Sequence, residues 1–287
     1  MRIAVLICEA IDNSSQLIFD TNEKRVWAKS IYKKINLDDS VALEVACRVS
    51  ANTGSYVESL TLGSPASVSL VRQFVLPRVS KSVIIVDDER SLENSDSYYA
   101  AAVLGGYLSR YRWDMIFCGN ETSDYGGGMT GPVLSASLNS CYVGNVVDVV
   151  SVDVEKRVTR VKTKKEWGKR EVLEIPLPVI LGFEPGEVDP QVATFDERLG
   201  KLDEAPDLVR VEEVNTYAAI KKNSWKVDIH KTKPRGIFVP DSFLSPVEKV
   251  RAIMSGGLSN KKGQFVTGTA EQIVDRIVSF LTEKQII

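Results

Sequence analysis

The stretch of sequence best suited to chemistry runs from Gly119 to Pro132 and reads Gly-Asn-Glu-Thr-Ser-Asp-Tyr-Gly-Gly-Gly-Met-Thr-Gly-Pro. Its glycines allow backbone N–H groups to approach a ligand closely. The stretch leads into an apolar helix expected over 133–138, and the N-terminus of a helix can bind phosphate. Thr130 could cap that helix or bond a phosphate oxygen. The pattern predicts a phosphate-binding loop, with a plain surface loop as the alternative, because it matches neither a Walker A motif nor a dinucleotide-binding fingerprint.

A second candidate is the run Asn36-Leu37-Asp38-Asp39, which directly precedes a predicted helix. The amide of Asn36 can donate to and accept from a base or a ribose, and Asp38 or Asp39 can cap the helix. As a bare pattern, these residue types more often form only a cap and a turn. The carboxylates elsewhere in the chain show no spaced pair that is typical of a catalytic site.

Histidine and cysteine, the commonest metal ligands besides carboxylates, are scarce. The one histidine is His230, so a histidine-based metal site or a Ser-His-Asp triad would depend on that residue alone. We interpret it as a surface residue of a polar loop. The cysteines are widely spaced and form no Cys-x-x-Cys pair, which is typical of reduced thiols in a cytoplasmic protein; they are Cys8, Cys47, Cys118 and Cys141. We therefore predict no metal site and no catalytic residue.

The composition excludes several classes of function. Of the 287 residues, 44% are hydrophobic and 26% are charged, which is typical of a globular protein. The formal net charge of -2 gives no basic surface for nucleic acid. No apolar run approaches the roughly 20 residues that span a bilayer. A strand begins at Ile3, and we expect no targeting peptide before it.

Apolar runs that alternate with helical patterns organise the first half of the chain. Strands are expected over 3–7, 55–62, 82–86 and 115–118, and helices over 39–49, 66–76 and 97–111. This alternation predicts an α/β fold, doubly wound, with a mostly parallel sheet and helices on both faces. Ligands bind such sheets at the carboxyl ends of the strands. The loops after Ile7, Leu62 and Cys118 should therefore converge.

The pattern changes near residue 143. Segments 146–150 and 157–163 predict an antiparallel ribbon, and 177–181 a further buried strand. Four lysines are expected on the solvated face of the ribbon, namely Lys162, Lys164, Lys165 and Lys169. Beyond Gly182 the chain loses periodicity as far as Gly236, and a helix with one apolar stripe is expected over 269–284. We predict a core domain over 1–185 and an arm over 186–287 that packs on a partner subunit or on its own core.

Five segments, in the correct order, resemble the electron transfer flavoprotein beta-subunit family over roughly residues 1 to 200. Ile3 to Asp12 resembles the first strand and turn of that family, and the run from Asn36 to Asp39 resembles its Asn-Pro-Phe-Asp helix start. Asp124, followed by Thr130-Gly131, matches the register of its nucleotide loop. The other two segments are Glu171 to Leu181, which is similar to the signature strand, and Asp189 to Phe195, which is similar to a Pro-Arg-Tyr-Ala-Thr-Leu segment. The tail from Gly236 is similar to that of forms whose partner is an amine dehydrogenase.

The resemblance implies a nucleotide-binding core, similar to the adenine nucleotide alpha hydrolases, in a heterodimer with an alpha subunit. In that family the alpha subunit holds the redox FAD, which carries electrons from flavin-dependent dehydrogenases to an acceptor. The beta subunit binds AMP, or a second FAD in electron-bifurcating forms. Phe195 stands where the family carries a leucine that anchors the dehydrogenase, although a core phenylalanine is an alternative. The implied nucleotide-binding positions are Leu6, Asn36, Asp39, Leu62, Gly119, Asp124, Gly126, Gly127, Gly128, Met129, Thr130 and Gly131.

Several residues depart from the family pattern and leave the identity of the nucleotide open between AMP, a second FAD and none. Gly126-Gly127 stands where bifurcating forms often carry Asp-Thr, which removes side-chain ligands for a diphosphate, whereas Pro132 resembles the bifurcating type. The other departures are Cys8 for Lys, Leu37 for Pro, Met129 for Gln, and the run Pro77 to Lys81 in place of Gly-Ala-Asp. A different class of function, a nucleotide-hydrolysing or adenylate-transferring enzyme, would need metal ligands, for which Glu121 and Asp124 are the candidates.

Overall fold

The structure, a computed structural model, describes residues 1–12, 14, 18–20, 25–26, 32–87, 96–214, 240, 243–254 and 267–283. The chain forms two compact units, Met1–Asp228 and Ile229–Ile287. The boundary between them falls later than residue 185, where the change of sequence pattern was expected to divide the chain. His230 and Gly236 lie outside the described residues.

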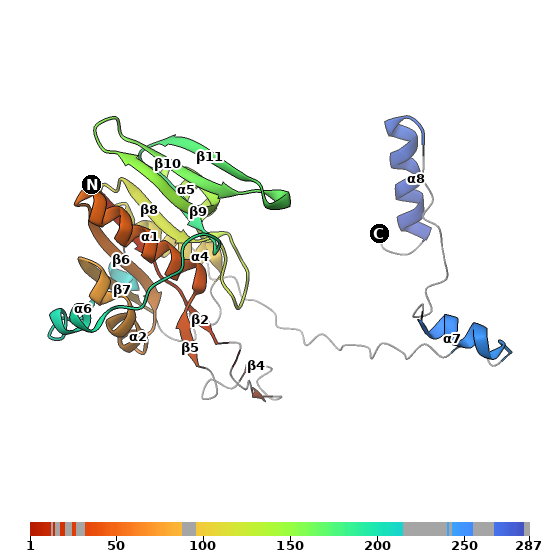
Figure 1. Cartoon of the computed structure of the whole chain (residues 1–287), viewed down its shortest axis with the longest axis horizontal. Coiled ribbons are helices and arrows are strands. Elements are labelled where there is room, and N and C mark those ends of the chain that lie inside the picture. Colours follow the sequence, from red (N-terminus) through yellow and green to blue (C-terminus); the bar gives the residue numbers. More distant parts are fainter. Residues whose placement is uncertain are drawn as a thin grey trace. The chain divides into compact units, whose positions relative to one another are not determined.

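A nine-stranded sheet forms the centre of the first unit, in the order β11-β10-β9-β12-β8-β1-β6-β7-β13 (Figure 1). Neighbouring strands from β9 to β13 pair in parallel, while β10 pairs antiparallel with both β9 and β11. This arrangement confirms the mostly parallel α/β sheet and its antiparallel ribbon. The strands are β1 (Arg2–Leu6), β6 (Tyr56–Gly63), β7 (Lys81–Val86), β8 (Met115–Gly119), β9 (Cys141–Asp153), β10 (Val158–Lys164), β11 (Arg170–Pro176), β12 (Val179–Phe183) and β13 (Asp207–Arg210).

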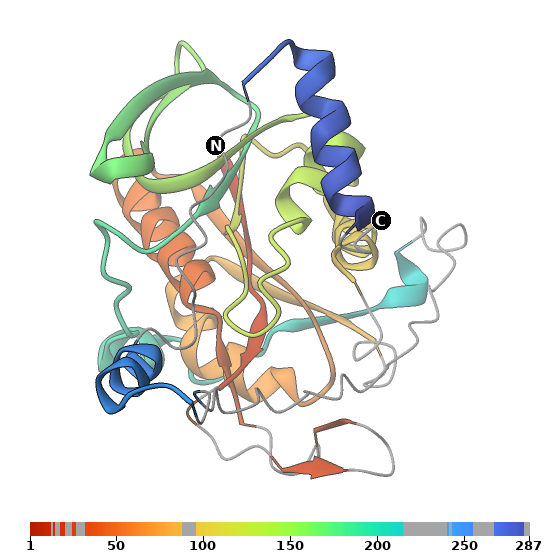
Figure 2. The ribbon, with the colours of Figure 1, turned by 90° about the vertical axis from the view of Figure 1, so that its right-hand side faces the viewer.

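Helices cover both faces of the sheet (Figure 2). One face packs against α1 (Leu37–Thr53) and α2 (Ser67–Phe74), and the other against α4 (Ser97–Leu108) and α5 (Thr130–Leu138). Central strands buried on both faces are apolar at successive positions, which explains the continuous runs in the sequence. In β8, for example, Phe117 is fully buried on one face, where its ring lies 4.8 Å from that of Phe183, and Ile116 is buried on the other.

Smaller elements complete the first unit. Strands β2 (Glu9–Ile11) and β5 (Lys33–Ile35) pair antiparallel beyond the end of β1, and β3 (Phe19–Asp20) pairs with β4 (Arg25–Val26). The helix expected over 66–76 ends earlier, at Phe74, and is followed by η2 (Leu76–Arg78), whose Pro77 lacks the N–H that a continuing helix needs. The remaining elements are η3 (Glu166–Gly168), α6 (Phe195–Gly200) and η4 (Val211–Glu213).

The segment after Gly182 contributes to the sheet, although its sequence shows little periodicity. Its strand β13 pairs in parallel with β7 at one edge, with Leu208 opposite Ile84. The second unit, described by itself, contains α7 (Pro246–Met254) and α8 (Ala270–Glu283), and α8 confirms the helix expected over 269–284. Packing of the arm on a partner subunit stays a prediction. In the described part of the chain, no helix has the length and apolarity needed to cross a membrane.

Candidate functional site

Two of the three loops that were expected to converge meet at a single carboxylate, that of Asp39. Its Oδ2 accepts a hydrogen bond from the N–H of Cys8, just after β1, at 2.8 Å. Its Oδ1 accepts one from the N–H of Gly119, at the end of β8, at 2.6 Å. Leu6 and Leu62 lie at the carboxyl ends of the neighbouring strands β1 and β6. The structure therefore brings these predicted positions to one edge of the sheet.

Asp39 lies in the first turn of α1 and is only 4% exposed. Burial raises the pKa of its carboxyl group from 3.8 to about 7, against the effect of the Cys8 and Gly119 N–H groups, which favour the carboxylate. The prediction that Asp38 or Asp39 caps the helix is wrong: the residue at the N-cap position is Asn36, and it makes no capping hydrogen bond with its side chain. The carboxylate of Asp39 is instead used to join two strand ends.

Asn36 and Asp38 hold the loop that follows β8. Asn36 Nδ2 donates to the carbonyl oxygen of Glu121 at 2.8 Å, and its Oδ1 accepts from the N–H of Ser123 at 3.2 Å. Asp38 Oδ2 accepts from the N–H of Glu121 at 3.1 Å. The amide of Asn36, which is 1% exposed, is therefore engaged with protein backbone on both of its polar atoms. Its expected contact with a base or ribose stays a prediction.

Asp124 fastens the middle of the same loop. Its Oδ2 accepts from the N–H of Ile11 in β2 at 3.0 Å, and its Oδ1 accepts from the N–H of Tyr125 at 2.8 Å. Two positions shortly after Asp124 favour glycine: Gly126 and Gly128 both have φ +59°, in the left-handed region. Figure 2 shows this loop, in yellow-green, next to the end of β1. Asp124 thus acts here as a brace for the loop.

The glycine-rich loop ends at the N-terminus of α5. Helix α5 begins at Thr130, three residues earlier than predicted, and Met129 occupies the N-cap position without a capping side-chain bond. The prediction that Thr130 caps this helix is therefore wrong. Within the described part of the chain, the N–H groups of Thr130 and Gly131 have no acceptor, as is usual in the first turn of a helix. These two donors, together with the Thr130 hydroxyl, fit one phosphate group.

Tyr142 of β9 supports the start of α5 and was missed by the sequence reasoning. A Cβ added to Gly131 would lie 2.5 Å from Tyr142 Cε2, and one added to Gly144 would lie 3.1 Å from the tyrosine oxygen. One added to Gly182 would overlap that same oxygen. Three glycines thus leave room for one ring beneath the loop. The glycines were visible in the sequence, but nothing there indicated which ring they accommodate.

Phe195 is the first residue of α6, and its side chain is 77% exposed. The alternative interpretation, a core phenylalanine, is therefore wrong. A capping box starts this helix: Thr194 Oγ1 accepts from the Glu197 N–H at 3.2 Å, and Glu197 Oε2 accepts from the Thr194 N–H at 2.6 Å. The expected contact of Phe195 with a dehydrogenase stays a prediction.

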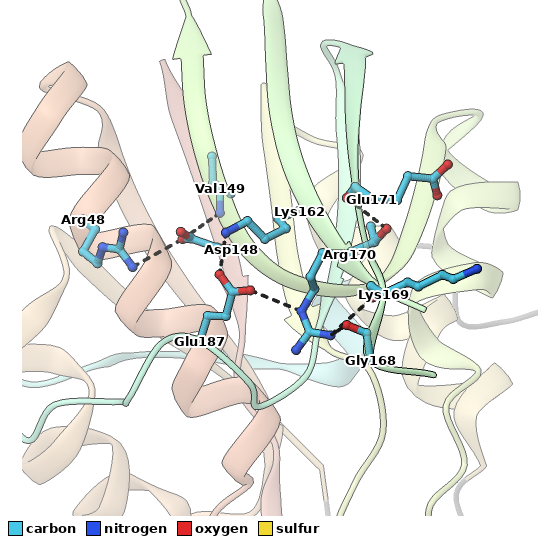
Figure 3. Close-up of polar contacts among 10 residues, drawn as sticks. Arg48, Asp148, Val149, Lys162, Gly168, Lys169, Arg170, Glu171 and Glu187 are labelled. Atoms are coloured by element: carbon cyan, nitrogen blue, oxygen red, sulfur yellow. Dashed lines mark hydrogen bonds and ion pairs between the residues drawn. The ribbon is translucent and has the colours of Figure 1, made fainter. Parts of the chain in front are cut away.

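Residues 184–194, which connect β12 to α6, are fastened at two points. Glu187 accepts from Lys162 Nζ at 2.6 Å and from Arg170 Nε at 3.2 Å, so that its carboxylate links β10 to β11 (Figure 3). Farther along, Gln191 donates its N–H to Glu44 Oε2 at 3.1 Å, and its carbonyl oxygen accepts from Arg78 at 2.8 Å. The connection to α6 is thereby tied to both the ribbon and the core.

The ribbon lysines are partly exposed, as expected, but most of them form ion pairs with neighbouring glutamates. Lys162 pairs with Glu187, and Lys164 pairs with Glu184 at 3.3 Å. Lys165 pairs with Glu171 at 3.1 Å.

Comparison with known proteins identifies the family. The model of the electron transfer flavoprotein domain matches residues 28–220. The chain is 25% identical over 181 residues to the electron transfer flavoprotein subunit beta of Thermoanaerobacterium thermosaccharolyticum, covering 63% of this chain and 67% of that protein. It is 25% identical over 205 residues to protein FixA of Azotobacter vinelandii, covering 70% and 69%. It is also 27% identical over 142 residues to the acryloyl-CoA reductase electron transfer subunit gamma of Anaerotignum propionicum, covering 48% and 52%. The chain therefore belongs to the electron transfer flavoprotein family, in its beta-subunit branch.

Proposed function

We propose that this chain is the beta subunit of a heterodimeric electron transfer flavoprotein that carries electrons from flavin-dependent dehydrogenases to an acceptor. Its relatives are named as electron transfer subunits, which supports this assignment. In the proposed complex, FAD held mainly by the alpha subunit supplies the redox chemistry. The residues of this chain bind a structural AMP, fix the loops around it and present a contact surface to the dehydrogenase.

The start of α5 is the observation that carries the AMP proposal. It offers the two N–H groups of Thr130 and Gly131 and one hydroxyl, a donor set that suits a single phosphate. Gly126 and Gly127 add no side-chain ligand for a diphosphate. AMP is therefore favoured over a second FAD in this subunit.

The charges around the loop indicate that backbone donors, not side-chain cations, would hold the phosphate. Burial, together with the carboxylates of Glu121 and Glu184, raises the pKa of Asp38, although the N–H of Glu121 acts in the opposite direction. A phosphate at the start of α5 gains from N–H groups that are already fixed in place, because binding then carries no cost of ordering them. In the proposal, the loop is held in place before the nucleotide binds, through the side chains of Asn36, Asp38 and Asp39.

The proposed dehydrogenase contact is the exposed face of α6. Phe195, at 77% exposed, and Leu199, at 56%, form an apolar surface that a partner could cover. The ties of residues 184–194 hold this surface in place before a partner arrives. Large aromatic side chains of this kind are frequent hot spots in protein interfaces.

The deciding experiment is extraction of nucleotide from the chain purified with its alpha subunit. We expect mass spectrometry of the denatured complex to show AMP, with flavin absorbance equal to one FAD per heterodimer. Two flavins would refute AMP in favour of the bifurcating alternative, and a complex with no adenine nucleotide would refute the site. Hydrolysis of added ATP by the purified chain would support the enzyme alternative instead.

A matched pair of glycine variants tests the loop itself. Gly126→Ala places an alanine at φ +59° with only the Thr122 carbonyl oxygen as near as 4.0 Å, and Gly54→Ala places one at φ +64° after α1 with no atom within 4 Å. Both variants carry similar backbone strain of about 1 kcal/mol. We expect the AMP content to fall only in Gly126→Ala. Equal AMP content in the two variants would contradict a role for the loop.

A further inference from the structure

A second candidate site lies between α2 and α6, away from the glycine-rich loop. A groove of about 630 Å³ there has an apolar lining that includes Pro65, Val68, Pro77 and Leu202. This volume falls within the range of roughly 300 to 1,000 Å³ that is typical of sites for small organic ligands. The groove is formed by residues 65–77 and 198–202, so it lies wholly within the first unit.

The charged residues of the groove are all basic. Arg72, Arg198 and Lys201 line it, and no acidic side chain does. Lys201 is neutralised by Glu204, whose carboxylate lies 2.7 Å away. Neither arginine forms an ion pair with any residue that the structure describes. The groove therefore has an unbalanced positive charge at its two arginines.

Arg198 also has an unsatisfied donor. Its guanidinium lies over the ring of Phe74, 5.8 Å from the centroid, and its Nε is buried without a hydrogen-bond partner among the described residues. Arg72 from α2 uses one nitrogen to donate to the Leu202 carbonyl oxygen at 2.6 Å, and its other guanidinium donors have no acceptor among the described residues. A donor without an acceptor is unfavourable, so those terminal guanidinium N–H groups of Arg72 and Arg198 at the groove that are unpaired within the described chain, and not the enclosed Arg198 Nε, favour an incoming oxygen ligand.

We propose that the groove between α2 and α6 binds a small monocarboxylate with an apolar stem. The planar fork of an arginine matches the two oxygens of a carboxylate, and two arginines from different helices can share one. The apolar stem lies on the prolines and Val68. A carboxylate fits better than inorganic phosphate because most of the lining is apolar and would leave a fully polar ion unsolvated. Binding joins α2 to α6. The inference does not depend on AMP, because the groove uses none of the residues of the nucleotide loop.

Hexanoate is the probe, titrated into the full-length chain and followed by ligand-observed NMR. Hexanol, which has the same stem without the charge, and inorganic phosphate, which has charge without the stem, are the controls. We expect saturable binding of hexanoate, at least tenfold tighter than that of either control. Binding of hexanol or phosphate as tight as that of hexanoate would overturn the proposal. Tighter binding of the peptide acetyl-Leu-Glu-Leu-amide would also overturn it, in favour of a protein segment as the occupant.

Variants locate the binding. Arg198→Gln and Arg72→Gln should each weaken hexanoate binding about tenfold, whereas Arg112→Gln, at an exposed arginine outside the groove, should leave it unchanged. An equal loss in all three would show nonspecific attraction and would overturn the proposal. Ser69→Glu provides a test in which both arginines are retained: a carboxylate placed in the groove should abolish hexanoate binding, while Ser69→Ala should not. Unchanged affinity in Ser69→Glu would contradict the assignment.

Discussion

Replacing Asp39 by asparagine removes a buried carboxylate that joins α1 to the ends of β1 and β8. Because burial raises the pKa of this group from 3.8 to about 7, the folded chain binds a proton between those pH values that the unfolded chain releases. The stability contributed by this proton is fully present below pH 3.8 and is lost as the pH rises through about 7. Roughly three pKa units at 1.36 kcal/mol each correspond to a fall of about 4 kcal/mol in the free energy of unfolding.

Asparagine cannot ionise, so Asp39→Asn should lack this fall. Asparagine keeps one acceptor oxygen but turns an NH2 group, which cannot accept, toward either Cys8 or Gly119. The hydroxyl oxygen of a protonated carboxyl group can still accept from an N–H group, so the substitution costs about 1 to 3 kcal/mol even where wild-type Asp39 is protonated. The variant should therefore be the less stable protein at pH 4.5, and the difference should shrink or reverse by pH 8.5. Urea unfolding followed by tryptophan fluorescence at several pH values measures both curves.

A matched substitution separates this effect from a general change of charge. Asp153 lies in the turn between β9 and β10, where the backbone N–H of Lys156 lowers the pKa of its carboxyl group. Asp153→Asn should keep the pH-dependent loss of stability that the wild type shows. If the curves of Asp39→Asn and the wild type run parallel from pH 4.5 to 8.5, the carboxylate is not protonated in the folded chain and the reasoning fails.

Three other substitutions test the supports of the site. Gly182→Ala would overlap the oxygen of Tyr142, so it should lower the free energy of unfolding by about 1 to 3 kcal/mol, measured by urea unfolding, and Tyr142→Phe in the same chain should restore part of it. Glu44→Gln leaves the guanidinium of Arg78, 2.8 Å away, without its buried partner and should cost about 3 kcal/mol; a loss below 1 kcal/mol would show that the pair is solvated. Glu187→Gln breaks partly exposed ion pairs and should cost less than about 1 kcal/mol by thermal unfolding, with the cost falling further in high salt.

The sheet could be predicted from the sequence where its strands are buried on both faces. In β1, four successive buried residues follow Arg2, and such a run has few interpretations other than a central parallel strand. Strand β13 could not be predicted in this way. Its residues are mostly exposed, and Leu208 remains 57% exposed at the edge of the sheet. The segment is a strand because β7 offers it a partner, and this partner is more than 100 residues away in the chain.

The glycine-rich loop could likewise be located from composition, but the hydrogen bonds that residues elsewhere in the chain make to it could not be predicted. Asn36 carries the residue type of a helix cap, and its side chain is nevertheless engaged with Glu121 and Ser123. These partners are 85 and 87 residues away, so no local pattern encodes the choice. The side chain of an N-cap residue does not always bond the helix start. Here it bonds backbone groups of the loop instead, because buried polar groups require hydrogen-bond partners.

The first turn of α1 acts on the proposed phosphate site without touching the donors at α5. Asn36, Asp38 and Asp39 lie within four consecutive positions, which occupy about one turn of helix at 1.5 Å per residue. From that turn, hydrogen bonds reach the end of β1, the end of β8 and the loop that follows β8. A displacement of the helix start must therefore move both loops together, because each hydrogen bond tolerates only a few tenths of an ångström before it weakens. The position of the first residues of the loop relative to the two strand ends is thus set by the first turn of α1. Ligand affinity should for that reason be more sensitive to substitutions in this turn than to changes of the exposed side chains on the loop itself.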